Sequence, residues 1–266
     1  MSRDFTYHKY RALCEAFCLQ GYSICTVADY LSNHPSESKI VVLRHDVDRR
    51  LQHAVRMAII ESEFGIRSTY YFRYNKEVFH PAYIQRIADM GHEIGYHYET
   101  IDKAKGDSKT AIKIFADELA KFREIAEVNT ICMHGNPLTK WINRDLWKEY
   151  NFSDFGITGE AFISVKDIPY FSDTGRTWAD KYKMKDYLPS AGPNNGGQTA
   201  KHVACSTDDL IHILSSGHVR SAYVLAHPER WNERLSSWSM SLVADTITNL
   251  CKIMISFRNK KCVKVM

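Results

Sequence analysis

Two carboxylates close together are the first feature of this sequence that could do chemistry. Asp46 and Asp48, in the segment Arg44-His-Asp-Val-Asp48, follow the apolar run 39–43 directly. In an extended strand, side chains two residues apart point to the same side. Neighbouring carboxylates repel unless a cation or a shared proton lies between them. The pair predicts a metal ligand beside a general base, although either residue could instead cap the helix expected to follow.

A second polar group closes the segment Gly91-His-Glu-Ile-Gly-Tyr-His-Tyr-Glu99. His97 and Glu99 share a face by the two-residue period of a strand. An imidazole and a carboxylate are both suitable ligands for a divalent transition metal. This pair therefore indicates that the segment could contribute to a metal site.

Two further histidines follow apolar runs, His134 in Met133-His-Gly-Asn-Pro137 and His227 in Leu225-Ala-His-Pro-Glu-Arg-Trp231. Because a residue before proline is held in an extended backbone, His227 has limited freedom, which suits a general acid or base. A cation, a carboxylate base and a histidine acid are together the parts needed for metal-assisted hydrolysis.

The elements that must position these residues alternate along the chain. Helices are expected at 7–19, 51–63, 82–90, 109–125 and 242–255, and strands at 39–43, 68–72 and 92–96, with further apolar runs at 130–133, 152–157 and 222–226. Repeated strand and helix units predict a parallel sheet with crossover helices, closed or nearly closed into a barrel. In such folds the working residues lie at the carboxyl ends of the strands.

Length and composition favour one soluble enzyme-sized domain. The 266 residues predict a single domain, 1–266, with a helical segment at about 1–35. Lys and Arg are interspersed with Asp and Glu, which argues against a nucleic-acid partner. No leader-like or membrane-spanning run is found, so a cytoplasmic location is expected. The Pro-, Gly- and Asn-rich stretch 188–199 predicts a surface loop.

At this point the sequence resembles the polysaccharide deacetylase family, also called NodB-homology or carbohydrate esterase family 4 proteins, in order from Ile40 to Trp231. The resemblance implies a deformed (β/α) barrel. In place of the family's Thr-Phe-Asp-Asp motif, this chain has the segment ending in Asp46 and Asp48, which implies that Asp46 is the base and Asp48 a metal ligand. The run Gly-His-Glu-Ile-Gly, 91–95, is retained before His97, a second ligand.

The resemblance also has departures. Ile101 stands where the family has its second metal-binding histidine, and Glu99 is the preferred replacement, with His134 a more distant candidate. His134-Gly-Asn-Pro replaces the motif that orients the base, so His134 is counted among the catalytic residues. The segment from Ser172 to Trp178 replaces the fourth motif, and His227 matches the catalytic acid.

The implied activity is removal of the N-acyl group of an amino sugar in bacterial surface-polysaccharide biosynthesis, with a divalent metal, preferably zinc. The expected substrate is a small carbohydrate or a lipid- or nucleotide-linked sugar, contacted by Asp173, Trp178 and Arg230. Arg44 could line the same pocket. Two alternatives stay open: a catalytically silent barrel that binds a glycan or a partner protein, and an amidohydrolase acting on a non-sugar amide.

Overall fold

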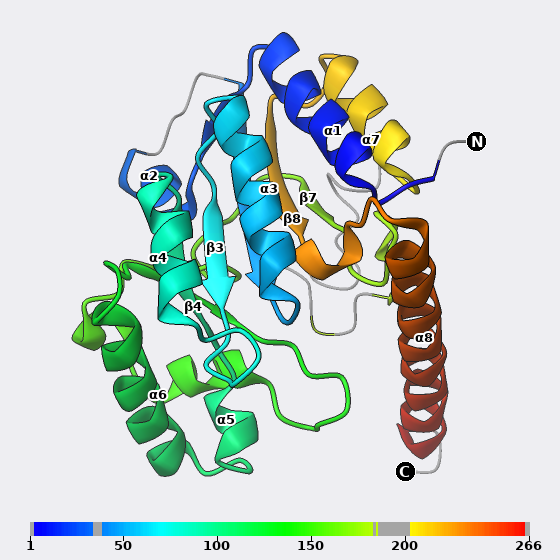
Figure 1. Ribbon diagram of the computed structural model, residues 1–266. Coiled ribbons are helices and arrows are strands. Elements are labelled where there is room, and N and C mark those ends of the chain that lie inside the picture. The colour runs from blue at the N-terminus through cyan, green and yellow to red at the C-terminus, as the bar shows by residue number, and fades with distance from the viewer. Residues whose placement is uncertain (1–2, 34–38, 183–184, 186–202, 264–266) are drawn as a thin grey trace.

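The computed structural model describes residues 3–33, 39–182, 185 and 203–263 (Figure 1). Its strands are β1 Ser23–Cys25, β2 Ile40–Val47, β3 Thr69–Phe72, β4 Glu93–Tyr98, β5 Thr130–Met133, β6 Gly159–Glu160, β7 Tyr170–Ser172 and β8 Ser221–Ala226. Its α-helices are α1 Tyr7–Leu19, α2 Val27–Asn33, α3 Leu51–Glu63, α4 Pro81–Asp89, α5 Thr100–Lys103, α6 Ser108–Arg123, α7 Thr207–Ser215 and α8 Leu235–Val263. Short 3₁₀ helices include η1 Asn143–Lys148, η2 Phe152–Phe155, η3 Asp180–Tyr182 and η5 Pro228–Arg230.

All strand pairs of the described chain are parallel, in the order β6-β5-β4-β3-β2-β8-β7, with β1 added beside β2. Helices α3, α4 and α6 lie over one side of the sheet, and α1 and α7 lie side by side (Figure 1). The path ends at β6 and β7, which do not pair with each other within the described residues, so the sheet is a half-barrel. The predicted α/β fold with a parallel sheet is confirmed.

Strand β2 lies inside the sheet, pairs with β1, β3 and β8, and is buried along its whole length. It extends past the predicted end at residue 43 because Arg44, His45 and Asp46 all find partners inside the protein. The pleat sends Arg44 and Asp46 to one face and His45 to the other. One strand therefore supplies polar groups to both sides of the sheet.

The structure corrects two expected elements. The apolar run 152–157 is not a strand: η2 occupies its first part, Asn151 caps that helix by accepting a hydrogen bond from the Ser153 N–H, and Gly156 ends it at φ +68°. The strand comes later, at β6. The last helix is longer than the predicted 242–255 and spans α8. The loop expected at 188–199 lies outside the described residues.

Two apolar cores pack against the sheet. One contains the aromatic side chains of β3 and β4 with α3 and α6, and the other joins α1 and α7 to β2 and β8. Trp178 and Trp231 belong to the second core and pack against Phe5. In the described part of the chain, no helix is both long enough and apolar enough to cross a membrane.

A fully buried carboxylate fastens α3 to the outer face of β2 and β3. Glu61 accepts hydrogen bonds from Ser68 Oγ at 2.6 Å and Tyr70 OH at 3.0 Å, and from Tyr10 OH of α1. His45 Nε2 lies 2.6 Å from the same carboxylate. Burial alone would raise the pKa of Glu61, but His45, His92 and Ser68 lower it to about 2.

Replacing Glu61 by leucine is expected to lower the free energy of unfolding by about 3–5 kcal/mol, because it leaves several buried polar groups without their acceptor. Urea unfolding followed by circular dichroism measures the loss. Glu63→Leu on the same helix is the matched control, since Glu63 forms only an exposed ion pair with Arg11 and should cost less than about 1 kcal/mol. Equal losses in the two variants would contradict the assigned role.

The same network predicts acid sensitivity. The folded pKa of Glu61, about 2, lies below the ordinary value of 4.5. A depressed carboxyl pKa contributes stability that is present above the unfolded pKa and is lost as the pH falls towards the folded pKa. Unfolding curves of the wild type should therefore converge on those of Glu61→Leu as the pH is lowered through this window.

Candidate active site

A cavity of about 390 Å³ lies at the carboxyl ends of β2, β4, β5 and β8. Six of the nine residues predicted from the sequence line it: Asp46, Asp48, His97, His134, His227 and Arg230. Because parallel strands end at the same edge of a sheet, residues far apart in the sequence meet there. The cavity volume is within the usual range for small-molecule sites.

Two imidazoles face the Asp48 carboxylate at one end of this cavity. Asp48 Oδ1 lies 3.5 Å from His97 Nε2 and 3.5 Å from His134 Nε2. That oxygen is buried and has no hydrogen-bond partner among the described residues. Burial would raise the pKa of Asp48, but His134, His97 and His227 hold it well below its usual value. The carboxylate is therefore charged and faces two imidazoles.

The other ring nitrogens explain why these atoms suit a cation. His97 Nδ1 lies 3.0 Å from the carbonyl oxygen of Cys132, which can only accept a hydrogen bond. His134 Nδ1 lies 3.3 Å from Glu99 Oε2. In the tautomer that binds a metal, each Nδ1 carries the proton, and the Nε2 lone pairs of the neutral rings then point towards the Asp48 carboxylate, where a cation would stabilise them. Asp48, His97 and His134 are thus side chains of the types that bind divalent metal ions, whereas among the described residues only Asp46, His97 and Cys132 have ligand atoms that all lie within 4.8 Å of one another.

Glu99 is held behind His134. Its Oε2 accepts a hydrogen bond from Arg73 Nη2 at 2.7 Å, and Lys103 Nζ lies 3.6 Å from Oε1. Burial would raise the pKa of Glu99, but His134 and Arg73 lower it to about 2. Glu99 does not line the cavity. Sequence reasoning favoured Glu99 as a metal ligand, and in the structure its carboxylate contacts Arg73, Lys103 and His134.

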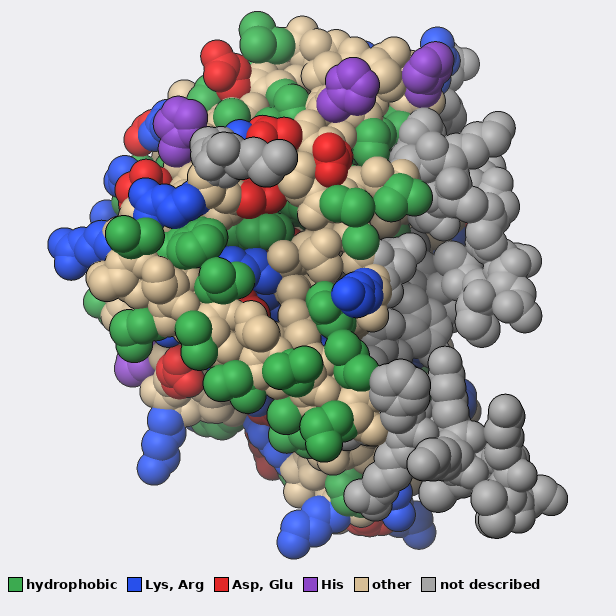
Figure 2. Space-filling model, turned by 90° about the vertical axis from the view of Figure 1, so that its right-hand side faces the viewer, with side chains coloured by type: hydrophobic (Ala, Val, Ile, Leu, Met, Phe, Trp, Pro, Cys, Tyr) green, Lys and Arg blue, Asp and Glu red, His purple; other side chains and the backbone are tan. Residues whose placement is uncertain are grey.

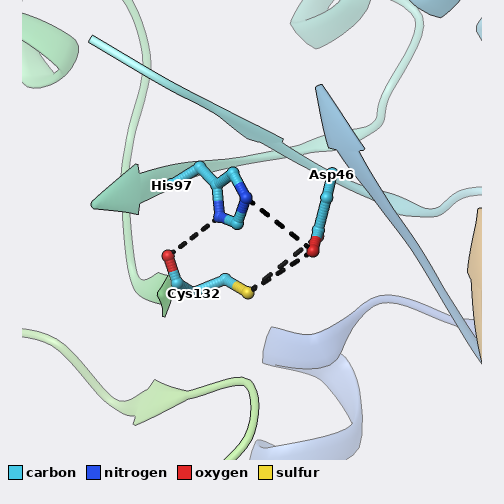
Figure 3. A group of neighbouring side chains, drawn as sticks. All are labelled: Asp46, His97 and Cys132. Atoms are coloured by element: carbon cyan, nitrogen blue, oxygen red, sulfur yellow. Dashed lines mark hydrogen bonds and ion pairs between the residues drawn. The ribbon is translucent and has the colours of Figure 1, made fainter. Parts of the chain in front are cut away.

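A second buried group could also hold a metal: Asp46, His97 and Cys132, from β2, β4 and β5 (Figure 3). Asp46 Oδ2 lies 3.8 Å from His97 Nε2 and 3.8 Å from Cys132 Sγ. The two groups share His97, whose Nε2 atom lies 3.8 Å from Asp46 Oδ2 and 3.5 Å from Asp48 Oδ1. Sequence reasoning did not select Cys132, which lies inside a strand rather than at the end of one.

The guanidinium of Arg44 lies next to the Asp46 carboxylate. Arg44 Nη2 lies 3.5 Å from Asp46 Oδ2, and Arg44 Nη1 donates to Tyr223 OH at 2.9 Å. The guanidinium lies 4.2 Å from the ring centroid of Phe162 and 5.1 Å from that of Tyr223. Arg44 is fully buried and does not line the cavity, contrary to expectation. Arg44 therefore forms a buried ion pair with Asp46.

His227 is fixed by Asp173 at the opposite side of the cavity. Its Nδ1 lies 2.6 Å from Asp173 Oδ1, and its backbone N–H donates to the same carboxylate at 3.0 Å. Arg230 and Trp231 also donate to Asp173. Burial and Arg230 lower the pKa of His227, but Asp173 and Glu229 raise it above the ordinary value overall. Nδ1 is the donor to Asp173, so Nε2 is the nitrogen free to exchange a proton.

The structure separates other predicted residues from the cavity. Asp173 lies beneath His227, and Trp178 lies in the second core, where its Nε1 donates to Thr207 Oγ1. Neither Asp46 nor Asp48 caps α3, because the residue at its N-cap position is Arg50. The capping alternative therefore does not account for the paired carboxylates.

Glu229 and Arg73 line the cavity but were missed. Burial, and then the charge of Asp48, raise the pKa of Glu229 to about 7. Both residues follow predicted strands, so the strand-end rule that found the histidines was sufficient to find them. Glu229 can therefore carry a proton inside the cavity near neutral pH.

No protein-family model and no curated protein matches this sequence. Among solved structures, BA3943 from Bacillus anthracis, a pseudoenzyme of the CE4 family, is 15% identical over 80% of this chain and 61% of its own, with a TM-score of 0.42. A BA3943 mutant with restored enzymatic activity gives the same identity and TM-score over 63% of its chain. This chain thus spans less than two thirds of BA3943.

A mutant of the peptidoglycan deacetylase PdaC from Bacillus subtilis is also 15% identical, over 81% of this chain and 97% of its own, with a TM-score of 0.39. The likeness is distant. The structures that resemble this chain include both a deacetylase and a pseudoenzyme. Activity has to be argued from the residues of the cavity.

Proposed function

We propose that this protein is a metal-dependent deacetylase that hydrolyses the N-acyl group of an amino sugar, as a divergent member of the polysaccharide deacetylase family. The observation that carries the proposal is the buried Asp48 Oδ1 atom, which has no hydrogen-bond partner among the described residues and lies 3.5 Å from two imidazole nitrogens. Asp46 and His227, to which we assign the roles of general base and general acid, line the same cavity.

Asp48, His97 and His134 would hold the metal, and Glu99 would orient His134. Two imidazoles and a carboxylate are a frequent ligand set of catalytic zinc, and three protein ligands leave a position open. A bound divalent ion supplies Lewis acidity, which polarises the acyl oxygen and lowers the pKa of a water molecule. Zinc is our preferred ion.

Two side chains of the protein, those of Asp46 and His227, then carry out the proton transfers. Asp46 accepts the proton of the attacking water, with Arg44 holding its carboxylate in place. His227, protonated and anchored by Asp173, donates a proton to the departing amine. Asp173 is thus a positioning residue rather than a substrate contact. Arg230 and Arg73 line the cavity and can bind the hydroxyl or phosphate oxygens of a sugar substrate.

The proposal is tested by measuring metal content and acyl release together. Purified protein, as isolated and after reconstitution with zinc, is incubated with N-acetylated monosaccharides, nucleotide-linked N-acetyl sugars and a non-sugar amide of similar size. Acetate release that depends on stoichiometric metal and on Asp46 supports the deacetylase. Metal-dependent cleavage of only the non-sugar amide would favour an amidohydrolase. Absence of metal and of turnover with every substrate would favour a silent binding protein.

Replacing Asp173 by asparagine is expected to move the alkaline limb of the pH profile of kcat/KM to lower pH. His227 must be protonated to act as the acid, and its raised pKa keeps it protonated at higher pH; loss of the Asp173 charge lowers that pKa. Asp208→Asn, which removes an exposed carboxylate paired with Lys9, is the control. An unchanged profile in Asp173→Asn would show that His227 is not the acid.

A further inference from the structure

Helix α8 has its polar side facing the protein and its apolar side facing outward. Ser241 Oγ donates to the carbonyl of Glu229 at 3.2 Å, and Asn249 Nδ2 donates to the carbonyl of Gly175 at 2.8 Å. Asp245 lies 3.5 Å from Arg176 Nη1. These three α8 residues are buried. A surface helix of a monomer normally has the opposite arrangement, with its apolar stripe towards the core.

The outward side carries a regular apolar seam, which we define as Met240, Val243, Ile247, Leu250 and Met254. Each of these side chains is between 55% and 70% exposed. Their spacing alternates between three and four residues, the a and d positions of a heptad. On the side of the molecule where α8 lies, hydrophobic side chains gather in the lower half (Figure 2). The pattern is typical of a helix that pairs with another helix.

We propose that the seam of α8 binds the same seam of a second copy of this chain, forming a two-fold symmetric dimer. A narrow a/d stripe indicates a helix partner, whereas helices that lie on a membrane have a wider apolar face and a basic polar face. Along the seam, between 235 and 254, Lys252 is the one basic residue, and the other basic residues of α8, Arg258, Lys260 and Lys261, follow the seam. The positions beside the seam, 239, 244, 246 and 251, are Ser, Ala, Thr and Cys, so no like charges oppose self-association.

The exposed apolar surface is large enough for this role. A standard interface buries about 800 Å² per partner, and the five seam side chains, each more than half exposed, form an apolar core suited to such an interface. A self-complementary patch is what a two-fold dimer requires, because the same residues occur on both sides.

Dimerisation would also affect the cavity, because Ile247 belongs to the seam and lines the cavity as well. Thr248, Cys251 and Lys252 of α8 line it too. A partner helix on the seam would therefore lie next to the cavity opening. The dimer does not depend on the proposed chemistry, and a monomeric protein could still be a deacetylase.

The test is sedimentation equilibrium of the full chain at micromolar concentration. The wild type should be a dimer, and the double variant Val243→Glu with Leu250→Glu should dissociate at least about 100-fold more readily, because unpaired carboxylates are costly to bury. Leu19→Glu, at an exposed leucine of α1 outside the seam, should leave the dimer intact. Circular dichroism checks that each variant is folded.

Three outcomes would overturn the proposal: a monomeric wild type, a dimer that persists in the folded double variant, or equal dissociation in the Leu19→Glu control. An exposed apolar helix face could instead bind a lipid surface. Flotation with vesicles of phosphatidylethanolamine and phosphatidylglycerol tests this alternative. A monomeric wild type that binds these vesicles, together with a double variant that does not, would assign the seam to a lipid surface instead.

Discussion

Alanine in place of His134 is expected to remove the metal from the purified protein, whereas serine in place of Cys132 is expected to leave it bound. His134 Nε2 lies 3.5 Å from Asp48 Oδ1, and no protein hydrogen bond competes for that oxygen among the described residues. Cys132 lies beside Asp46, whose charge is already compensated by Arg44. The two substitutions thus separate two overlapping candidate metal sites.

The expected effects are graded. Loss of a group that orients a ligand typically costs about 10–100-fold in metal affinity, so Glu99→Gln should fall in that range and His134→Ala should exceed it. Zinc titration against a chromophoric chelator measures all three variants. If Cys132→Ser loses zinc while His134→Ala retains it, the metal belongs to Asp46, His97 and Cys132, and Asp46 cannot then be the free base.

Asn in place of Asp46, and separately alanine in place of His227, should each lower kcat by about 10²–10⁴-fold while zinc stays bound. Asp46 accepts a proton and His227 donates one in the proposed reaction, and neither is needed to hold the ion. Metal content measured on the same preparations distinguishes these variants from ligand variants. Arg44→Met is an informative companion, because it leaves Asp46 in place and removes the cation that positions it.

Either of two results would contradict these assignments. Loss of zinc from Asp46→Asn would make Asp46 a ligand. Full activity in His227→Ala would transfer the role of acid to another group in the cavity, and Glu229 is the strongest candidate, because its pKa is raised to about 7. The variant Glu229→Gln, assayed beside His227→Ala, decides between the two residues.

The sequence predicted the elements with strong periodicity and failed on short ones. Helices α1 and α3 begin and end at the predicted residues, because their apolar positions repeat over three turns. Strands β1, β6 and β7 have only two or three residues, which is too short for any pattern to be recognised. At η2, the capping residue Asn151 and the left-handed Gly156 delimit a short 3₁₀ helix where a strand was predicted.

The site was predicted less completely than the fold. Strand ends located Asp46, Asp48, His97, His134 and His227, but the choice between Glu99 and His134 as the third ligand depends on where the loops after β4 and β5 place their side chains. Sequence spacing ranked Glu99 first because it is two residues from His97. In the structure, Arg73 donates a hydrogen bond to Glu99, and His134 Nε2 lies 3.5 Å from Asp48 Oδ1. The choice of His134 as third ligand is our proposal, and it depends on contacts between different strands that sequence spacing does not reveal.

Because side chains alternate along β2, the register of this strand decides which of its residues face the cavity. Arg44 and Asp46 face the cavity side while His45 joins the Glu61 network on the other side. A one-residue deletion or insertion within the strand would exchange the two faces. Such a shift would turn the His45 imidazole towards the cavity in place of the Asp46 carboxylate. It would also turn the Asp46 carboxylate towards Glu61 and α3. Natural variation in length should therefore be absorbed outside this strand, and engineered changes in length belong there as well.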